Sequence, residues 1–110
     1  MTFPELLLEI KKVPAKEIRF DTEDSLELVI KVDTLKELNG VLERYFGAAA
    51  KPAGKDPTKE TLQLTEEYGG IRSDQTFYYL QRDGLAYYGM LWPWGDRVSV
   101  TVRLFSKKNK

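Results

Sequence analysis

The stretch that decides the fold is GMLWPWGDR, from Gly89 to Arg97, because it joins two segments that both read as strands. It holds the two tryptophans of the chain, one on each side of Pro93. The segment after it, RVSVTVRLF, alternates valines with polar residues, and this period of two predicts a strand with one buried face. The segment before it, LAYYGMLW, carries apolar groups on both faces. We therefore expect a corner between antiparallel strands rather than a ligand platform, and its turn sets their register.

Two turns fit this corner, and they bury opposite faces of the middle strand. A type I turn over Trp92–Gly95 puts the proline at its favoured second position and makes the glycine a bulge. A two-residue turn at Gly95–Asp96 places Leu91 opposite Val100 instead and reverses the two faces. We favour the first turn, because the proline then needs no ladder hydrogen bond. In that register the core face consists of Ala86, Tyr88, Met90 and the valines Val98, Val100 and Val102, and the outer face carries Tyr87, Leu91, Ser99, Thr101 and Arg103.

The dipeptide Asp83-Gly84 predicts a tight hairpin between the first two strands of this C-terminal meander. A two-residue turn there pairs Tyr79 with Tyr88 and Phe77 with Met90. The opposite face still carries apolar side chains, which is more surface than a monomer usually leaves wet. Either helices cover both faces, which is the favoured explanation, or the second face meets a partner or a ligand. This second face consists of Tyr78, Leu80, Tyr87 and Leu91.

The first half of the chain predicts two helices and a hairpin. Residues 2–12 have a capping threonine and an apolar stripe, and residues 34–46 have a capping box of Thr34 and Glu37. Gly40 inside the second helix is expected to permit a close contact between helix and sheet. Residues 58–68 fit either a helix or a strand, and we favour the helix. Between the helices, alternation predicts a hairpin with Ile18 and Phe20 on one face and Leu26, Leu28, Ile30 and Val32 inward.

These elements predict an α+β fold in a single globular domain over residues 1–110. We expect an antiparallel sheet of about five strands, made of an N-terminal hairpin and a C-terminal three-stranded meander. Two or three helices are expected to pack mainly on one face of this sheet. The hydrophobic content of 42% and charged content of 31% are ordinary for a globular domain. The run SKKNK suggests that residues 105–110 form a frayed basic tail.

The composition narrows the chemistry. The chain has no cysteine and no histidine, which removes disulfides, thiolate ligands and the commonest general base. We expect no metal site and no cofactor. Basic and acidic residues balance at 17 each, so nucleic acid is not an expected partner. No signal peptide or membrane-spanning run is present, so we expect a cytoplasmic protein that makes no membrane contact.

The stretch EEYGGIRSDQT, from Glu66 to Thr76, is the most site-like part of the sequence. Its two glycines allow unusual backbone angles, and the four residues from Arg72 to Gln75 are all polar. Such a loop beside an aromatic sheet could bind a polar or anionic small molecule, with Arg72 as a forked donor. The favoured interpretation is an ordinary helix stop, a turn and an exposed lead-in to a strand. The candidate binding residues are Tyr68, Arg72, Asp74, Gln75, Tyr78, Tyr87 and Trp94.

The leading hypothesis for function is a small non-enzymatic binding or protein-interaction module. Its contact surface is expected to be the second face of the meander together with the Gly69–Gln75 loop, with a protein partner, a homodimer or a small polar ligand. The alternative is a small enzyme that uses carboxylate, tyrosine or arginine chemistry. A buried carboxylate with a raised pKa beside Arg72 would favour the enzyme. Trp94, at the tip of the corner, is the one ring left without a structural role.

Overall fold

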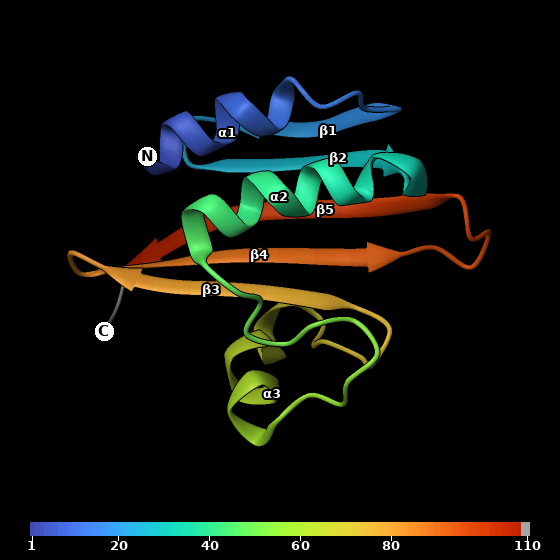
Figure 1. Ribbon diagram of the computed structural model, residues 1–110. Coiled ribbons are helices and arrows are strands. Elements are labelled where there is room, and N and C mark those ends of the chain that lie inside the picture. Colours follow the sequence, from blue (N-terminus) through green and yellow to red (C-terminus); the bar gives the residue numbers. More distant parts are fainter. Residues whose placement is uncertain (109–110) are drawn as a thin grey trace.

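A computed structural model describes residues 1–108 as one five-stranded antiparallel sheet with three α-helices, which is an α+β fold (Figure 1). The strands lie in the order β1-β2-β5-β4-β3, so β5 joins the N-terminal hairpin to the meander. Among the described residues, no helix has the length and apolar character needed to cross a bilayer. The elements are α1 (Phe3–Lys11), β1 (Glu17–Thr22), β2 (Ser25–Lys31), η1 (Val32–Thr34), α2 (Leu35–Phe46), α3 (Lys59–Thr65), η2 (Glu66–Tyr68), β3 (Thr76–Arg82), β4 (Leu85–Pro93) and β5 (Ser99–Lys108), where η marks a 3₁₀ turn.

The N-terminal helices follow their sequence signals with one exception. Thr2 caps α1 in a reciprocal capping box with Glu5. The predicted box at Thr34 is absent, because its hydroxyl donates to the Lys31 carbonyl (2.7 Å) and closes the 3₁₀ turn η1 before α2. That turn also carries Val32 out of the sheet, so its side chain is exposed rather than inward. Residues 58–68 are helical, as favoured, and Thr58 caps α3.

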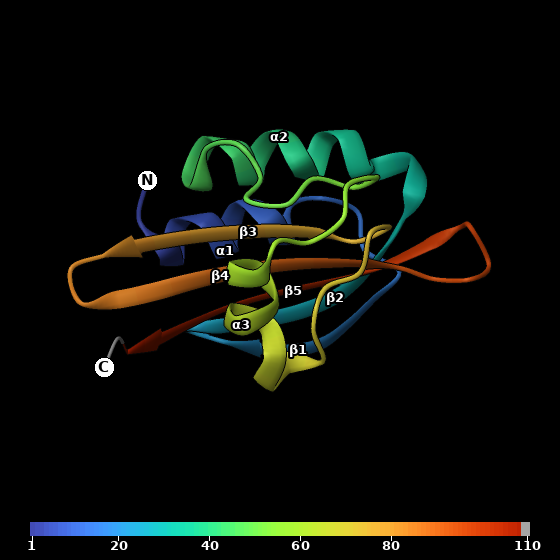
Figure 2. The same cartoon turned by 90° about the horizontal axis from the view of Figure 1, so that it is seen from below.

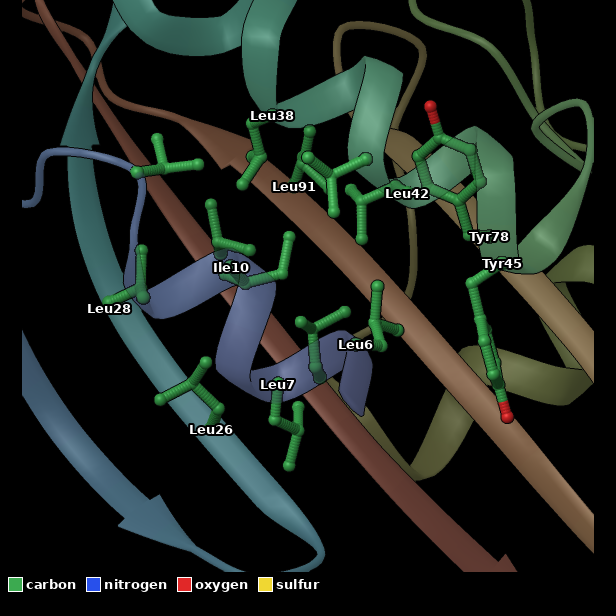
Figure 3. Packing of buried hydrophobic residues seen from close by; sticks show 14 of the residues in the cluster. Leu6, Leu7, Ile10, Leu26, Leu28, Leu38, Leu42, Tyr45, Tyr78 and Leu91 are labelled. Atoms are coloured by element: carbon green, nitrogen blue, oxygen red, sulfur yellow. The ribbon is translucent and has the colours of Figure 1, made fainter. Parts of the chain in front are cut away.

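The helices α1 and α2 pack side by side on one face of the sheet (Figure 1). Their leucines and aromatic rings meet the inward side chains of β2, β5 and β4 to form the larger core, part of which Figure 3 shows. The rings of this core include Tyr78, which is 1% exposed and donates its hydroxyl to Asn39 (2.8 Å). The face that the sequence offered as a contact surface is therefore covered by the chain's own helices.

The helix α3 and the turn η2 lie on the opposite face of the sheet, as Figure 2 shows. They cover a second apolar cluster, so α1 and α2 lie on one face, as expected, and α3 lies on the other. The ring of Tyr88 stacks on Phe105 with centroids 4.7 Å apart, and Tyr68 of η2 lies 4.6 Å from the same Phe105 ring. The buried members of this cluster are Ile71, Phe77, Ala86, Tyr88, Met90 and Phe105.

The meander confirms one turn prediction and corrects the other. Asp83 and Gly84 have φ of 53° and 79°, and Tyr79 pairs with Tyr88 as expected. At the corner, however, Leu91 pairs with Val102, so the favoured type I turn over Trp92–Gly95 is wrong. Leu91 shares the helix-covered face with the valines of β5, as the alternative turn predicted, although the register differs from that alternative by two residues.

The corner is a loop over residues 94–98, which is longer than either predicted turn. The Trp94 N–H donates to the Ser99 carbonyl (2.9 Å), and the Arg97 N–H donates to the Trp94 carbonyl (3.2 Å). One carboxylate oxygen of Asp96 accepts from the backbone N–H groups of Val98 (2.9 Å) and Ser99 (3.0 Å). These bonds stabilise the longer loop, and Val98, expected in the core, is exposed.

The C-terminal strand is longer than the sequence suggested. Residues 105–108 complete β5 beside β4, with Phe105 buried, so the expected frayed tail is wrong for these four residues. The remaining part of that prediction, residues 109–110, lies outside the described residues.

Candidate functional site

The helix-free part of the sheet lies on the same face as α3, over β1, β2 and β5. We call this surface the open face and define it by five side chains that line a pocket of about 280 Å³: Arg19, Phe20, Ser25, Glu27 and Arg103.

A β-bulge in β1 builds this surface. Ile18 pairs with Leu28 on the helix-covered face, but Phe20 pairs with Glu27 because Arg19 is an extra residue between them. Regular alternation would have placed Ile18 and Phe20 on one face, as the sequence predicted, and that prediction is wrong. The bulge turns the Phe20 ring onto the open face, where it is 53% exposed. Bulges often re-aim a side chain in this way beside functional sites.

Arg103 crosses the open face towards the second aromatic cluster. Its guanidinium carbon lies 5.0 Å from the centre of the Phe105 ring and 5.7 Å from that of Tyr68. Glu27 is its cross-strand neighbour, yet no carboxylate within residues 1–108 lies within ion-pair distance of Arg103. The rings therefore hold the guanidinium in place while its N–H donors stay available to a ligand.

Trp94 closes one end of the open face and has a structural role after all. Its indole N–H donates to the Thr101 hydroxyl (2.8 Å), which holds the ring over β5. The Arg19 guanidinium carbon lies 5.4 Å from the indole, and the Lys16 ammonium lies 6.0 Å from it. The ring is thus fixed by a hydrogen bond on one side and flanked by two cations.

A second pocket, of about 400 Å³, adjoins the open face where Arg103 contacts Tyr68. We call it the Tyr68 pocket. Gly69 and Gly70 both have positive φ, 93° and 76°, so the chain turns sharply out of η2 at a place where only glycine is unstrained. The pocket is lined by Tyr68, Gly69, Gly70, Arg72, Gln75 and Trp92.

Lys51 holds the loop of the Tyr68 pocket from behind. Its side chain is only 2% exposed, and its ammonium donates to the carbonyls of Ser73 (2.6 Å) and Gln75. Burial lowers the pKa of this ammonium. The Gln75 side chain accepts from the Arg72 N–H (2.7 Å) and closes the same turn. Lys51 is therefore an internal support of the loop.

The structure gathers only some of the seven predicted site residues. Tyr68, Arg72 and Gln75 line the Tyr68 pocket, and Asp74 lies beside it with its carboxylate 4.0 Å from Arg72 Nε. Trp94 borders the open face. The other two lie on the opposite face of the sheet, where Tyr78 is buried and Tyr87 packs against Phe3 and Tyr45.

Sequence reasoning missed most of the open face. It left Arg103 among the polar residues of a strand and placed Phe20 on the wrong face. The alternation pattern contains no signal for a bulge, so it could not have predicted that Phe20 and Arg103 lie on the same face. Trp92 was available as one of the two clustered tryptophans, but its contact with the glycine loop depends on the fold.

The carboxylates within residues 1–108 have the character of surface acids. None of them is buried. Glu5 and Asp96 have lowered pKa values, chiefly because their carboxylates accept hydrogen bonds from backbone N–H groups. Asp74, the acid nearest Arg72, is largely exposed.

Comparisons of the chain with known proteins do not identify a function for this site. No protein-family model matches the chain, and no curated protein or solved structure is significantly similar to it. Function must be argued from the site.

Proposed function

We propose that the protein is a non-enzymatic module that binds a protein partner through the open face of its sheet. The observation that carries the proposal is the bulge in β1, which leaves the Phe20 ring half-exposed beside Arg103. No described helix covers this ring, although described helices pack on both faces of the sheet elsewhere.

The residue types of the surface support a protein partner. Aromatic side chains and arginine dominate the binding energy at protein interfaces, especially where the rings are held rigidly. Here Trp94 is fixed by Thr101, and Arg103 is held between two rings. The two adjoining pockets, of about 280 and 400 Å³, are small and could each take one side chain of a partner.

Photo-crosslinking in the cells that produce the protein tests this proposal. The photoreactive amino acid p-benzoylphenylalanine replaces Phe20 in one variant and Ile18 in another. The two positions are 53% and 51% exposed on the same strand but face opposite sides of the sheet, so they form a matched pair. We expect a discrete crosslinked product from position 20 that is absent from position 18.

The product must also depend on the open face. Adding Arg103→Glu should abolish it, whereas Arg44→Glu, the same charge change on the exposed side of α2, should not. A product of equal yield from position 18, or none from position 20, would contradict the proposal.

A further inference from the structure

The charged side chains that line the open-face pocket indicate which class of ligand it can bind. Two arginines, Arg19 and Arg103, line it with one carboxylate, Glu27, and Arg19 is already ion-paired with Glu17 (3.4 Å). Among the described residues, Arg103 is therefore the lining cation that has no ion pair. Neither arginine is close enough to Glu27 for an ion pair among the described residues.

Both guanidinium groups are fixed by aromatic rings and keep donors available. The Arg103 guanidinium makes no hydrogen bond to the side chains or carbonyls of residues 1–108, whereas its main chain belongs to the sheet. Arg19 contacts Glu17 through Nε alone (3.4 Å), so its two terminal nitrogens have no partner in the same part of the chain. Guanidinium groups held on rings present their N–H edges in a fixed plane, which suits a carboxylate.

Resting on the proposed function, we infer that this pocket binds the side-chain carboxylate of an aspartate or glutamate in the partner protein. One negative charge matches the one arginine of the pocket that has no ion pair among the described residues, whereas a phosphate dianion would face Glu27 with a second charge left over. The half-exposed Phe20 ring then packs against an apolar residue next to the acid in the partner. Glu27 accepts an N–H from the partner's main chain.

Peptide titration of the ¹⁵N-labelled full chain tests the inference by NMR. The probe is a seven-residue peptide with one aspartate between a phenylalanine and a leucine. Two matched peptides carry asparagine or phosphoserine in place of the aspartate. We expect the aspartate peptide to shift the amide signals of Phe20, Glu27 and Arg103, and to bind about tenfold more tightly than the asparagine peptide, because it adds charge-assisted hydrogen bonds.

Variants locate the contact. Arg103→Glu should weaken binding of the aspartate peptide about tenfold or more, and Arg44→Glu should change it less than twofold or so. Tighter binding of the phosphoserine peptide overturns the single-charge argument, and so do shifts confined to other residues or no shifts at all. Concentration-dependent shifts of the same amides without peptide would assign the pocket to a second copy of the chain and overturn a separate acidic partner.

The outcome is separable from that of the proposed function. If the peptides fail but the crosslink from position 20 persists, the open face binds a protein and only the acidic class is wrong. If both fail, the open face is not a binding surface.

Discussion

Replacing Gly89 by alanine tests the register of the meander and the fit of α2 on the sheet. Gly89 lies on β4, directly opposite Tyr78 of β3 and Leu104 of β5. An added Cβ would lie 3.1 Å from Leu104 Cδ2, 3.2 Å from Tyr78 Cβ and 3.4 Å from the Phe46 ring of α2. The leucine methyl can rotate away, but the Tyr78 Cβ is attached to the backbone of the neighbouring strand. Relief of that contact requires β3 and β4 to move apart.

The magnitude follows from this crowding. Cβ atoms of directly opposite residues in an antiparallel pair normally lie about 4.5–5.5 Å apart, so the contact to Tyr78 is more than an ångström too short. Overpacking of this kind destabilises a core by roughly 1–3 kcal/mol. Loss of glycine entropy in the unfolded chain offsets about 0.5–1 kcal/mol. We therefore expect Gly89→Ala to lower the free energy of unfolding by roughly 1–2 kcal/mol.

Urea unfolding followed by circular dichroism measures the effect, and Gly40→Ala is the matched control. A Cβ at Gly40 meets no atom within 4 Å, so this glycine permits no close contact with the sheet, contrary to the sequence expectation. Alanine there should stabilise α2 by about 0.5–1 kcal/mol. If Gly89→Ala were as stable as Gly40→Ala, with unchanged m values, Gly89 would not face α2, and the pairing of β4 with β3 and β5 would be wrong.

Three further changes have defined outcomes. Burial raises the pKa of Tyr78 to about 12 from an unfolded value near 10, so its protonated form stabilises the fold fully below pH 10 and this stability is lost as the pH rises to 12. In urea unfolding measured from pH 9 to 12, the free energy of unfolding of Tyr78→Phe should fall by roughly 2–3 kcal/mol less than that of the wild type. An equal fall in the two proteins would exclude Tyr78 as the source of the alkaline loss. Lys51→Met should destabilise the protein by about 1–3 kcal/mol and speed hydrogen exchange in the loop of the Tyr68 pocket, because the carbonyls of Ser73 and Gln75 lose their donor. Because burial lowers the pKa of Lys51, the wild type should also gain stability as the pH rises through that pKa towards 10.5, a gain that the methionine variant should lack. Asp96 has a lowered pKa, chiefly because its carboxylate accepts the Val98 N–H, so its stabilising effect should be lost as the pH falls through that pKa; Asp96→Asn should lose less stability on acidification, and identical acid curves would exclude this role.

Local signals in the sequence predicted most of the elements. The cap at Thr2 and the hairpin at Asp83–Gly84 are set by bonds between near neighbours, so short motifs reveal them. The faces of the strands were harder to predict. Both sets of side chains on β4 are apolar and both are buried, one under α2 and one under α3, so apolar content alone could not choose between them.

The predicted turn between β4 and β5 was wrong for a different reason. Proline and glycine favoured a short turn there, but the side chain of Asp96 accepts from Val98 and Ser99 and makes a longer loop stable. Hydrogen bonds from a loop backbone to a side chain leave the alternation of apolar residues unchanged. The alternation therefore predicted that Val98 belongs to the strand, whereas β5 begins at Ser99.

The two parts of the candidate site also differ in how far the sequence predicts them. The Tyr68 pocket was partly predictable, because the paired glycines and the polar residues Arg72–Gln75 predict a turn. The open face was not, since it depends on one extra residue in β1. In a regular strand Phe20 would lie opposite Leu26, on the face where Lys11 of α1 now contacts Asp21.

The bulge also indicates how a partner approaches. An exposed edge strand normally invites pairing through its free main-chain groups, and bulges and charged side chains are the usual protection against it. The edge strand β1 has both, with Glu17, Arg19 and Asp21 along its length and a bulge at its centre. The same bulge that weakens edge pairing aims Phe20 at the open face. A partner that bound along the edge would meet disrupted pairing, whereas one that bound on the face would meet Phe20 and the two arginines. The complex should therefore leave the main-chain groups of β1 unprotected in hydrogen exchange while it protects residues beneath the open face.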